Sequence, residues 1–180
     1  MLLGYCSTMN TLIRPEKLYI DYPDRVPMVE FKPMAKDDFS AYWKYSIDSW
    51  KSDMGRAGLI EKDISHEKAE EQVKKFLPNG IDTPGHHLMH IVDDEETIGS
   101  IWFEIRERGV REAYLWDIVI DENYRGKGYG RDAMARLEEF VKEEGAERIS
   151  LNVFGFNAIA RNLYVKMGYH EAAITMMKYL

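Results

Sequence analysis

The stretch ENYRGKGYGRDAMARLEEF, residues 122–140, joins a glycine-rich turn directly to a helical pattern of apolar residues. Gly126, Gly128 and Gly130 alternate with larger side chains, and a glycine lets the backbone approach a ligand because it has no Cβ. The start of a helix offers unpaired N–H groups and the positive end of the helix dipole. Together these features predict a site for an anion, most naturally a phosphate. A tight strand-to-helix turn that binds nothing is the alternative explanation.

The established nucleotide-binding motifs fit this turn poorly. The P-loop pattern GxxxxGK[ST] occurs nowhere in the chain. The dinucleotide pattern GxGxxG fails because Arg131 stands where its third glycine would be. The glycine loop of a kinase would need a far longer chain with further catalytic segments. Nucleotide binding therefore stays only as an alternative.

Hydrophobic periods on both sides of the turn predict an α/β (α+β) domain. The expected order is strand, two helices, three strands, helix, strand, helix, and a last strand or pair of short strands. The unit around the glycine turn is typical of a right-handed crossover between parallel strands. The fold class is therefore a mixed, mostly antiparallel sheet flanked by helices, with a central parallel strand pair. The expected strands lie at 28–33, 87–92, 97–106, 112–121, 148–154 and 169–180, and the expected helices carry apolar stripes within 39–50, 69–77, 128–144 and 157–167.

The chain of 180 residues is long enough for one compact domain with one hydrophobic core. Residues 28–180 are expected to form that single domain. Residues 1–27 contain three prolines and no sustained hydrophobic period, so we expect an irregular N-terminal extension there.

The composition excludes several classes of partner. The chain carries 24 Lys and Arg against 31 Asp and Glu, a net charge of −7, and phosphate contacts with nucleic acid need clustered cations. No apolar run approaches the about 20 residues of a membrane span, so no membrane partner is expected. The N-terminus lacks a secretory signal, and the one cysteine, Cys6, fits a reducing compartment. The expected location is therefore cytoplasmic.

The stretch DIVIDENYRGKGYGRDAM, residues 117–134, resembles the acyl-CoA-binding motif of the GNAT superfamily of N-acetyltransferases. The core pattern of that motif, [RQ]xxGx[GA], is met from Arg125 to Gly130. Downstream, LNVFGFNAIARNLYVKMGYH (151–170) resembles the second signature of the family, and TMMKYL (175–180) resembles its closing strand. The resemblance implies that 28–180 is an acetyltransferase domain. It also implies that the two helices within 35–77 form the wall of the acceptor site.

By this resemblance the cosubstrate is acetyl-CoA, whose diphosphate would lie on the N–H groups of the glycine turn. The pantetheine arm would pair with the backbone of the preceding strand, where two neighbouring strands separate. Asn157 would cap its helix and also contact this arm. The implied coenzyme-binding residues are Ile118, Val119, Ile120, Arg125, Gly126, Lys127, Gly128, Tyr129, Gly130, Arg131 and Asn157.

Acetyl transfer to an amine needs a base for the amine proton, a stabilised oxyanion and a proton for the departing thiolate. Tyr164 matches the family tyrosine near the coenzyme sulfur, although it also shares an apolar helical stripe and core packing is its alternative role. Some members of the family carry a glutamate at the positions of Tyr114 or Asn152, and neither residue is acidic here. Asp117 is the first alternative base, because a charge inside the apolar run LWDIVI needs a partner or a purpose.

A structural hydrogen-bonding role for Asp117 is an equal alternative, as is a water chain in place of a direct base. Glu104 and Glu112 are weaker candidates for the base. His86, His87 and His90 suggest a metal, but His87 and His90 do not share a face of the strand and no acidic or cysteine partner is evident. No metal is therefore expected.

The predicted function is an acetyl-CoA-dependent N-acetyltransferase that moves the acetyl group directly to a primary amine of a small molecule or a protein. The alternative, from another class, is a non-catalytic acyl-CoA-binding sensor or interaction module. Dimers are common among relatives of this kind, so a homodimer is one expected arrangement.

Overall fold

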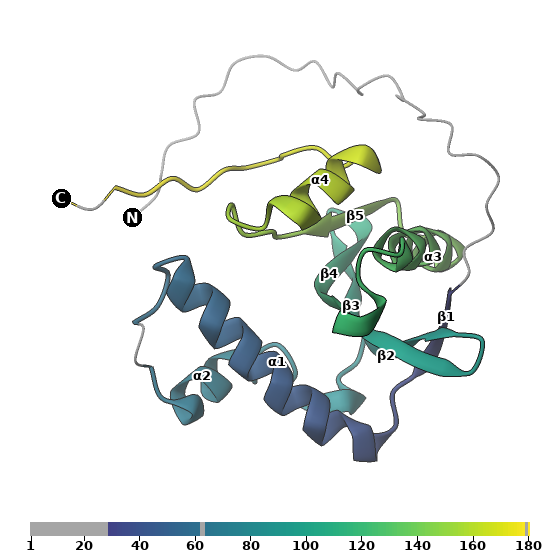
Figure 1. Cartoon of the computed structure of the whole chain (residues 1–180), viewed down its shortest axis with the longest axis horizontal. Helices are drawn as coiled ribbons and strands as arrows, with labels where there is room; N and C mark the ends of the chain where they lie inside the picture. The colour runs from purple at the N-terminus through teal and green to yellow at the C-terminus, as the bar shows by residue number, and fades with distance from the viewer. Residues whose placement is uncertain (1–28, 62–63, 179) are drawn as a thin grey trace.

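The computed structural model describes residues 29–61, 64–178 and 180 as a five-stranded sheet with helices on its faces (Figure 1). The predicted extension at 1–27 lies outside the described residues. The strands are β1 (Val29–Pro33), β2 (His86–Asp93), β3 (Glu96–Arg108), β4 (Val110–Ile120) and β5 (Arg148–Leu151). The helices are α1 (Lys36–Arg56), α2 (His66–Val73), α3 (Tyr129–Glu143) and α4 (Ala158–Lys166), with short 3-10 helices η1 (Gly80–Asp82) and η2 (Glu122–Tyr124).

The strands follow chain order across the sheet. β1 to β4 are antiparallel to their neighbours, and β5 is parallel to β4. This arrangement confirms the prediction of a mixed, mostly antiparallel sheet with a parallel pair. The pair lies at one edge of the described sheet rather than at its centre, because the predicted last strand is missing.

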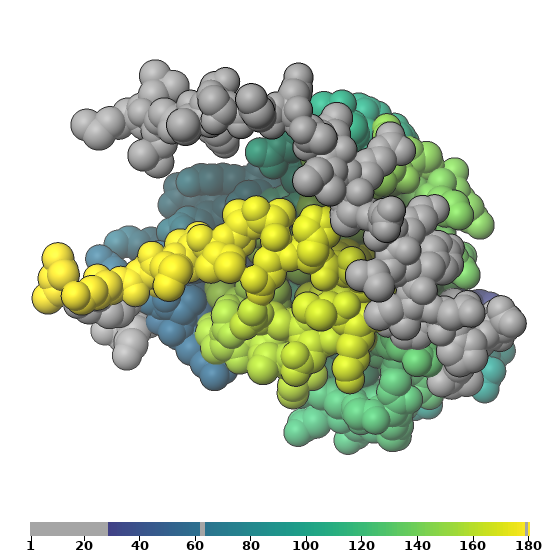
Figure 2. All heavy atoms as spheres, turned by 90° about the horizontal axis from the view of Figure 1, so that it is seen from above, coloured from purple at the N-terminus to yellow at the C-terminus, as the bar shows by residue number. Residues whose placement is uncertain are grey.

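The prediction of a strand within 169–180 is wrong. The described residues of this segment form no strand and join no strand of the described sheet. A strand is stable only when a neighbour takes up its backbone hydrogen bonds, and none does so here. The segment leaves α4 as an extended tail that projects beyond the rest of the described chain (Figure 2).

Each face of the sheet carries a separate hydrophobic core. On one face α3 and α4 cover Phe103 and Ile101, and the α3 stripe predicted from the sequence is fully buried at Ala133 and Leu137. We call this side the α3 face. On the other side, the α1 face, α1 and the segment after α2 cover Trp102. Within the described ranges, no helix is both long enough and apolar enough to cross a membrane.

One extra residue in β4 changes the direction of its side chains. Phe103 of β3 pairs with Leu115 of β4, whereas Trp102 pairs with Asp117, so Trp116 is a β-bulge. Trp116 stacks on Trp102 with ring centroids 5.3 Å apart. Simple alternation from Leu115 would place Asp117 on the α3 face. The bulge turns Asp117 towards the α1 face, where a side chain of α1 contacts it.

Candidate active site

The glycine turn has the geometry that an anion site requires. Gly126 and Gly128 adopt left-handed backbone conformations, with φ of 74° and 95°. A Cβ added at either residue would meet nothing within 4 Å, so the turn presents bare backbone to open space. Gly128 directly precedes α3, and no side chain caps this helix. Exposed N–H groups at the start of a 15-residue helix are suited to hold a phosphate.

Two tyrosines fasten this turn to the hairpin between β2 and β3. Tyr124 donates a hydrogen bond to Glu96, and Tyr129 donates one to Asp93. Asp93 is the last residue of β2 and Glu96 is the first of β3, so both tyrosines reach the same hairpin. The sequence predicted DDEE (93–96) only as a turn. The position of the glycines is thus set by hydrogen bonds that sequence spacing does not reveal.

The basic side chains of the turn lie around it in different directions. Arg125 Nε donates a hydrogen bond to the carbonyl oxygen of Ile120 over 2.9 Å. Lys127 Nζ lies 5.3 Å from the ring centroid of Tyr124. Arg131 Nη2 lies 3.7 Å from the neighbouring carboxylate, Asp132 Oδ1. The turn thus places three basic residues close together in a chain whose net charge is −7.

β4 and β5 separate next to the turn, as the resemblance implied for a pantetheine site. They pair only from Glu112–Arg148 to Leu115–Leu151, and β4 then continues to Ile120 with no described strand on that side. The side chains of Ile118 and Ile120 pack against the core on the α3 face. A Cβ on Gly99 of β3 would lie 2.1 Å from the oxygen of Val119, so β3 supports this backbone at close range. The edge of 118–120 is therefore rigidly held and open.

Asp117 is partly buried between this part of β4 and α1. The hydroxyl of Tyr42 donates a hydrogen bond to Asp117 Oδ2 over 3.2 Å. Burial raises the pKa of Asp117 to about 6, and the negative charge of Asp53 adds to the rise. Hydrogen bonds from Tyr42 and from the N–H of Ile118 act in the opposite direction. In the part of the chain that the structure describes, no lysine or arginine forms an ion pair with Asp117.

Tyr164 of α4 is 9% exposed and lies against the core on the α3 face. Its stripe neighbours Ala160, Leu163 and Met167 pack against the same core, so the predicted packing role is confirmed. Burial and the negative charge of Asp117 raise the pKa of Tyr164 to about 12. The two predicted catalytic residues are therefore close enough for the charge of one to change the acidity of the other. Asp117 stands two residues beyond the last pair of the β4–β5 ladder, Leu115 with Leu151.

The two weaker candidates for the base lie elsewhere, in a network of ion pairs. Glu112 is 2% exposed and accepts hydrogen bonds from Arg106 Nε at 3.0 Å and from Arg148 Nε at 2.6 Å. Burial alone would raise the pKa of Glu112, but the two arginines lower it overall. Glu104 accepts hydrogen bonds from Arg106 Nη1 at 3.2 Å and from the indole of Trp116 at 3.3 Å. This network joins β3, β4 and β5 at the closed end of the β4–β5 pair.

Asn157 caps α4, as predicted. Its Oδ1 accepts a hydrogen bond from the N–H of Ala160 over 3.1 Å. The cap fixes the start of the helix that carries Tyr164. The contact of Asn157 with a coenzyme stays a prediction.

The three histidines of β2 have separate partners. His86 accepts a hydrogen bond from the indole of Trp102 at 2.9 Å, and His90 contacts Asp38 of α1 at 3.1 Å. His87 stacks instead on Phe103 of the α3 face, with ring centroids 4.8 Å apart. Over 29–61, 64–178 and 180, no three histidine, cysteine or acidic side chains are grouped as metal ligands would be.

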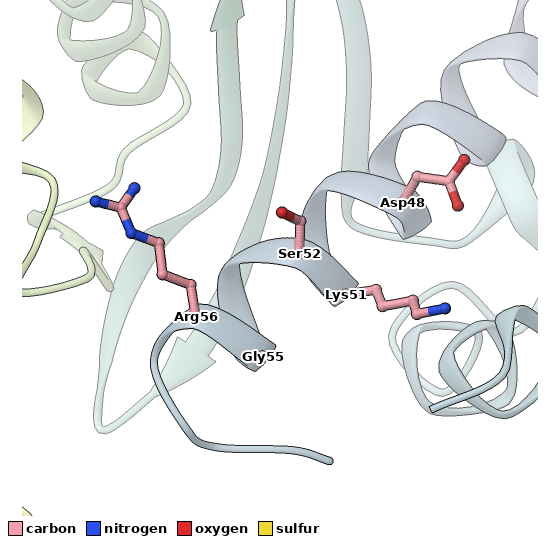
Figure 3. Close-up of a pocket in the computed structure, with 5 residues that line it drawn as sticks. All are labelled: Asp48, Lys51, Ser52, Gly55 and Arg56. Carbon is pink, nitrogen blue, oxygen red and sulfur yellow. The ribbon is translucent and has the colours of Figure 1, made fainter. Parts of the chain in front are cut away.

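A surface pocket of 280 Å³ lies along α1, apart from the residues described above (Figure 3). It carries charges of both signs and contains none of the predicted site residues. Arg56 at its end is directed towards the loop after β5, where its Cζ lies 3.9 Å from the ring centroid of Phe156. The lining residues are Asp48, Lys51, Ser52, Gly55 and Arg56.

Reasoning from the sequence expected the helices within 35–77 beside the acceptor site but missed the contact between Tyr42 of α1 and Asp117. Tyr42 was assigned to the core through its helical spacing, and it is indeed buried, but its hydroxyl contacts Asp117. The charge of Asp117 also raises the pKa of Tyr45, after burial, and Asp53 contributes to the same shift. The sequence signal for this contact was a polar atom, the hydroxyl of Tyr42, within an otherwise apolar helical stripe.

Comparison with known proteins places this geometry in a family. Residues 41–169 match the acetyltransferase (GNAT) family. YycN of Bacillus subtilis strain 168, an uncharacterised N-acetyltransferase, is 31% identical over 150 residues, which cover 82% of this chain and 96% of YycN. The crystal structure of YycN matches with a TM-score of 0.81 at 30% identity, covering 84% of this chain and 98% of that one.

Two further relatives agree with this assignment. YdgE of the same organism, also an uncharacterised N-acetyltransferase, is 32% identical over 149 residues, covering 82% of this chain and 95% of YdgE. The [ribosomal protein bS18]-alanine N-acetyltransferase of Escherichia coli K12 is 33% identical over 72 residues, covering 40% of this chain and 49% of that enzyme. The match to the family extends over most of the chain and includes the glycine turn, the separated strands and α4. This protein therefore belongs to the GNAT family of acetyltransferases.

Proposed function

We propose that this chain transfers the acetyl group of acetyl-CoA directly to a primary amine of a small molecule or a protein. The observation that carries the proposal is the environment of Asp117. A carboxyl group buried without a cationic partner is unfavourable, and such groups are concentrated where a protein moves protons. Asp117 stands two residues beyond the last β4–β5 pair, and its negative charge contributes to the raised pKa of Tyr164. A candidate base on the unpaired part of β4 and a candidate acid on α4 are thus coupled through their charges.

The residues of the turn and of β4 fit the cosubstrate. Acetyl-CoA supplies the acetyl group as a thioester. The N–H groups of the glycine turn would hold the diphosphate, since bare backbone and a helix N-terminus favour an anion. The unpaired edge of 118–120 would offer its amides to the pantetheine arm. One N–H of this edge would also stabilise the oxyanion that develops on the thioester carbonyl.

Asp117 would accept the proton of the acceptor amine, directly or through water. An alkylammonium has a pKa of about 10, so at neutral pH it must lose a proton before it can attack. With a pKa of about 6, Asp117 is ionised at neutral pH and is a stronger base than an ordinary aspartate. The acceptor would approach along α1, where the charges of Asp53 and Asp117 favour a cation.

Tyr164 would protonate the departing thiolate. Its raised pKa keeps the hydroxyl neutral at physiological pH, so a proton is always present to donate. The charge of Asp117 is one cause of that raised pKa. When Asp117 takes up the amine proton, this charge disappears and Tyr164 becomes a stronger acid. The two proton transfers would therefore assist each other.

The family and one relative support an amine acceptor. The relatives YycN and YdgE are N-acetyltransferases by name, and the enzyme of E. coli is named for the alanine of a ribosomal protein. An N-terminal amine and the amine of a small metabolite present the same ammonium group to Asp117. The acceptor is therefore proposed as a primary amine of either kind.

The test is release of free coenzyme A thiol from acetyl-CoA in the presence of a panel of amines. The panel would hold simple alkylamines, diamines, amino sugars and short peptides with free N-termini, and a reaction without amine would be the blank. Thiol release above the blank with at least one amine is expected. Tight binding of acetyl-CoA without release for any amine would favour the sensor instead. A melting temperature raised by ATP but not by coenzyme A would reject the coenzyme site itself.

A further inference from the structure

The β-bulge in β4 places two consecutive side chains, those of Trp116 and Asp117, on the same face of the sheet. In a regular strand, neighbouring side chains point to opposite faces. Here the ring of Trp116 stacks on Trp102 of the α1 face, and Asp117 accepts the hydrogen bond from Tyr42 on that same face. The proposed base therefore has a large aromatic ring beside it, on its own side of the sheet.

Trp116 belongs to a group of rings that is open to solvent at one end. Its ring centroid lies 4.5 Å from that of Phe76, in the segment after α2, and 4.7 Å from that of Tyr114. Phe76 is 41% exposed, and Trp116 and Tyr114 are only partly buried. We call these three residues the aromatic platform. Neighbouring rings that keep part of their surface in water form a binding surface for another apolar or aromatic group.

Stacking and hydrogen bonds hold the platform in position before a ligand arrives. The indole N–H of Trp116 donates to Glu104 over 3.3 Å, and the rings of Trp116 and Trp102 are inclined by 17°. Trp102 itself is buried and donates to His86 over 2.9 Å. The exposed rings thus rest on a buried, hydrogen-bonded layer. A preorganised surface of this kind loses little freedom when a flat group binds to it.

An aromatic group fits this platform better than a second cation. Rings also attract cations, and a diamine has a second ammonium group for such a contact. The guanidinium of Arg106, however, already lies 4.4 Å from the ring centroid of Tyr114, and Glu104 and Glu112 hold it there. Another cation at these rings would meet that positive charge. Asp117, by contrast, forms no ion pair with a lysine or arginine of the described ranges, so it is the site for a single ammonium group.

We infer that the acceptor is an aromatic primary amine, whose ammonium group lies at Asp117 and whose ring lies on the aromatic platform. This inference rests on the proposed function and names the class of its acceptor. A short linker between ring and amine suffices, because Trp116 and Asp117 are consecutive residues. Phe76 and Trp116 are then specificity-determining residues, since they contact only the part of the acceptor that does not react.

The first test compares two amines of equal charge, 2-phenylethylamine and propylamine, by release of coenzyme A thiol. The wild type is expected to have a kcat/KM at least about tenfold higher for 2-phenylethylamine, because burial of a phenyl ring contributes a factor of this size. Phe76→Ala, a change at the surface, is expected to reduce this ratio to below about threefold. Leu59→Ala is the matched control. Leu59 follows the far end of α1 and is 47% exposed, so the ratio should not change.

The second test needs no turnover. The chain has four tryptophans, and the indole N–H signal of Trp116 in a ¹H–¹⁵N spectrum is the one that disappears in Trp116→Phe. Titration with 2-phenylethylamine in the presence of coenzyme A is expected to shift this signal, because the ring current of a stacked phenyl group acts on nearby protons. Propylamine and 1,4-diaminobutane, which have no ring, should shift it little.

Three results would overturn the inference and leave the proposed function intact. The first is acetylation of propylamine or 1,4-diaminobutane that is at least as efficient as that of 2-phenylethylamine. The second is a ratio that Phe76→Ala leaves unchanged. The third is a Trp116 signal that 2-phenylethylamine does not shift although some amine is acetylated. A shifted signal without thiol release from any amine would contradict the proposed function and retain the aromatic site, and an unshifted signal without release would contradict both.

Discussion

The hydroxyl of Tyr42 donates a hydrogen bond to Oδ2 of Asp117 over 3.2 Å, across 75 positions of sequence. This bond favours the ionised carboxylate, whereas burial favours the neutral acid, and the balance leaves the pKa at about 6. Asp117 therefore changes charge close to physiological pH. Its role can be tested through activity, stability and pH dependence separately.

Asp117→Asn is expected to lower kcat by about 10²- to 10⁴-fold, the usual contribution of a general base. Asparagine keeps an acceptor for the hydroxyl of Tyr42 but cannot take up a proton. The same variant should be more stable than the wild type at pH 7.5. Folding raises the pKa of Asp117 from 3.8 to about 6, so the ionised group opposes folding above pH 6, by up to about 3 kcal/mol, and this effect vanishes below pH 4. Urea unfolding of the wild type and the variant at pH 7.5 and below pH 4 measures this difference in stability.

Glu112→Gln is the matched control for a buried carboxylate without a catalytic role. Its pKa is lowered by two arginines, so its ionised form stabilises the fold above the unfolded value of 4.5, and this stability is lost as the pH falls through the lower folded value. The variant should lose about 1.5–3 kcal/mol at neutral pH, because the neutral amide loses the charge-assisted hydrogen bonds from Arg106 and Arg148. If the Asp117→Asn variant kept the activity of the wild type, this result would contradict the proposed role of Asp117 as the base.

Tyr42→Phe should shift the acid limb of the pH–rate profile to higher pH. The lost hydrogen bond lowers the pKa of Asp117, so its removal raises that pKa above about 6. Because the base must be ionised, the rate would then begin to fall at a higher pH. Asp53→Asn should move the limb the other way, since the charge of Asp53 raises the same pKa. If the acid limb of the pH–rate profile lay at the same pH in both variants as in the wild type, a group other than Asp117 would control it.

Tyr164→Phe should reduce kcat by at least about tenfold and change the KM for acetyl-CoA by less than about threefold. The ring keeps its packing against the core, while the proton for the thiolate is lost. Tyr169→Phe is a suitable control, because its ring lies 5.7 Å from that of Tyr164. Steady-state kinetics with one good amine distinguish the two. Equal losses in both variants would indicate a packing effect only.

Gly128→Asp should raise the dissociation constant for acetyl-CoA by at least about 100-fold, through repulsion of the diphosphate and a blocked backbone. Gly109, in the β3–β4 turn, offers a matched control. Its φ is 77°, and an added Cβ there would also meet nothing within 4 Å. Gly109→Asp therefore carries similar backbone strain without touching the glycine turn. Calorimetry that gives the same affinity for both variants would place the coenzyme elsewhere.

Gly99→Ala should disturb the proposed coenzyme site through β3, the strand that supports it. The new methyl group would lie 2.1 Å from the oxygen of Val119, so the backbone of 118–120 must move. We expect weaker binding of acetyl-CoA together with a lower kcat, because the same backbone would hold the pantetheine arm and the oxyanion. A crystal structure of the variant with unchanged β4 and wild-type kinetics would refute this assignment.

Much of the fold follows from local sequence patterns. The glycine turn, the amphipathic helices and the order of the elements up to α4 were predicted correctly because each depends on neighbours in sequence, such as Gly128 before α3 or Asn157 before α4. The antiparallel pairs and the parallel pair then followed from element order. These features required no knowledge of tertiary contacts.

The features that define the site depend instead on contacts between distant segments. The bulge at Trp116 gives no signal in a strand that otherwise alternates, yet it decides which face Asp117 occupies. The hydrogen bond from Tyr42 joins a helix to a strand far along the chain. Residues 169–180 have the composition of a strand, but a strand also needs a neighbouring strand, which composition alone cannot identify. In each case a tertiary contact, rather than a local preference, determined the outcome.

The gap between β4 and β5 has a consequence for the lifetime of the protein. On the side away from β3, residues 116–120 have a row of backbone groups with no described strand beside them, and a thioester carrier lying there would extend the sheet. At a free concentration of about one hundred times its dissociation constant, such a carrier adds about 2.7 kcal/mol to the free energy of unfolding. Proteases remove a less stable protein faster. The cellular abundance of this enzyme would then rise and fall with the supply of activated acetyl groups.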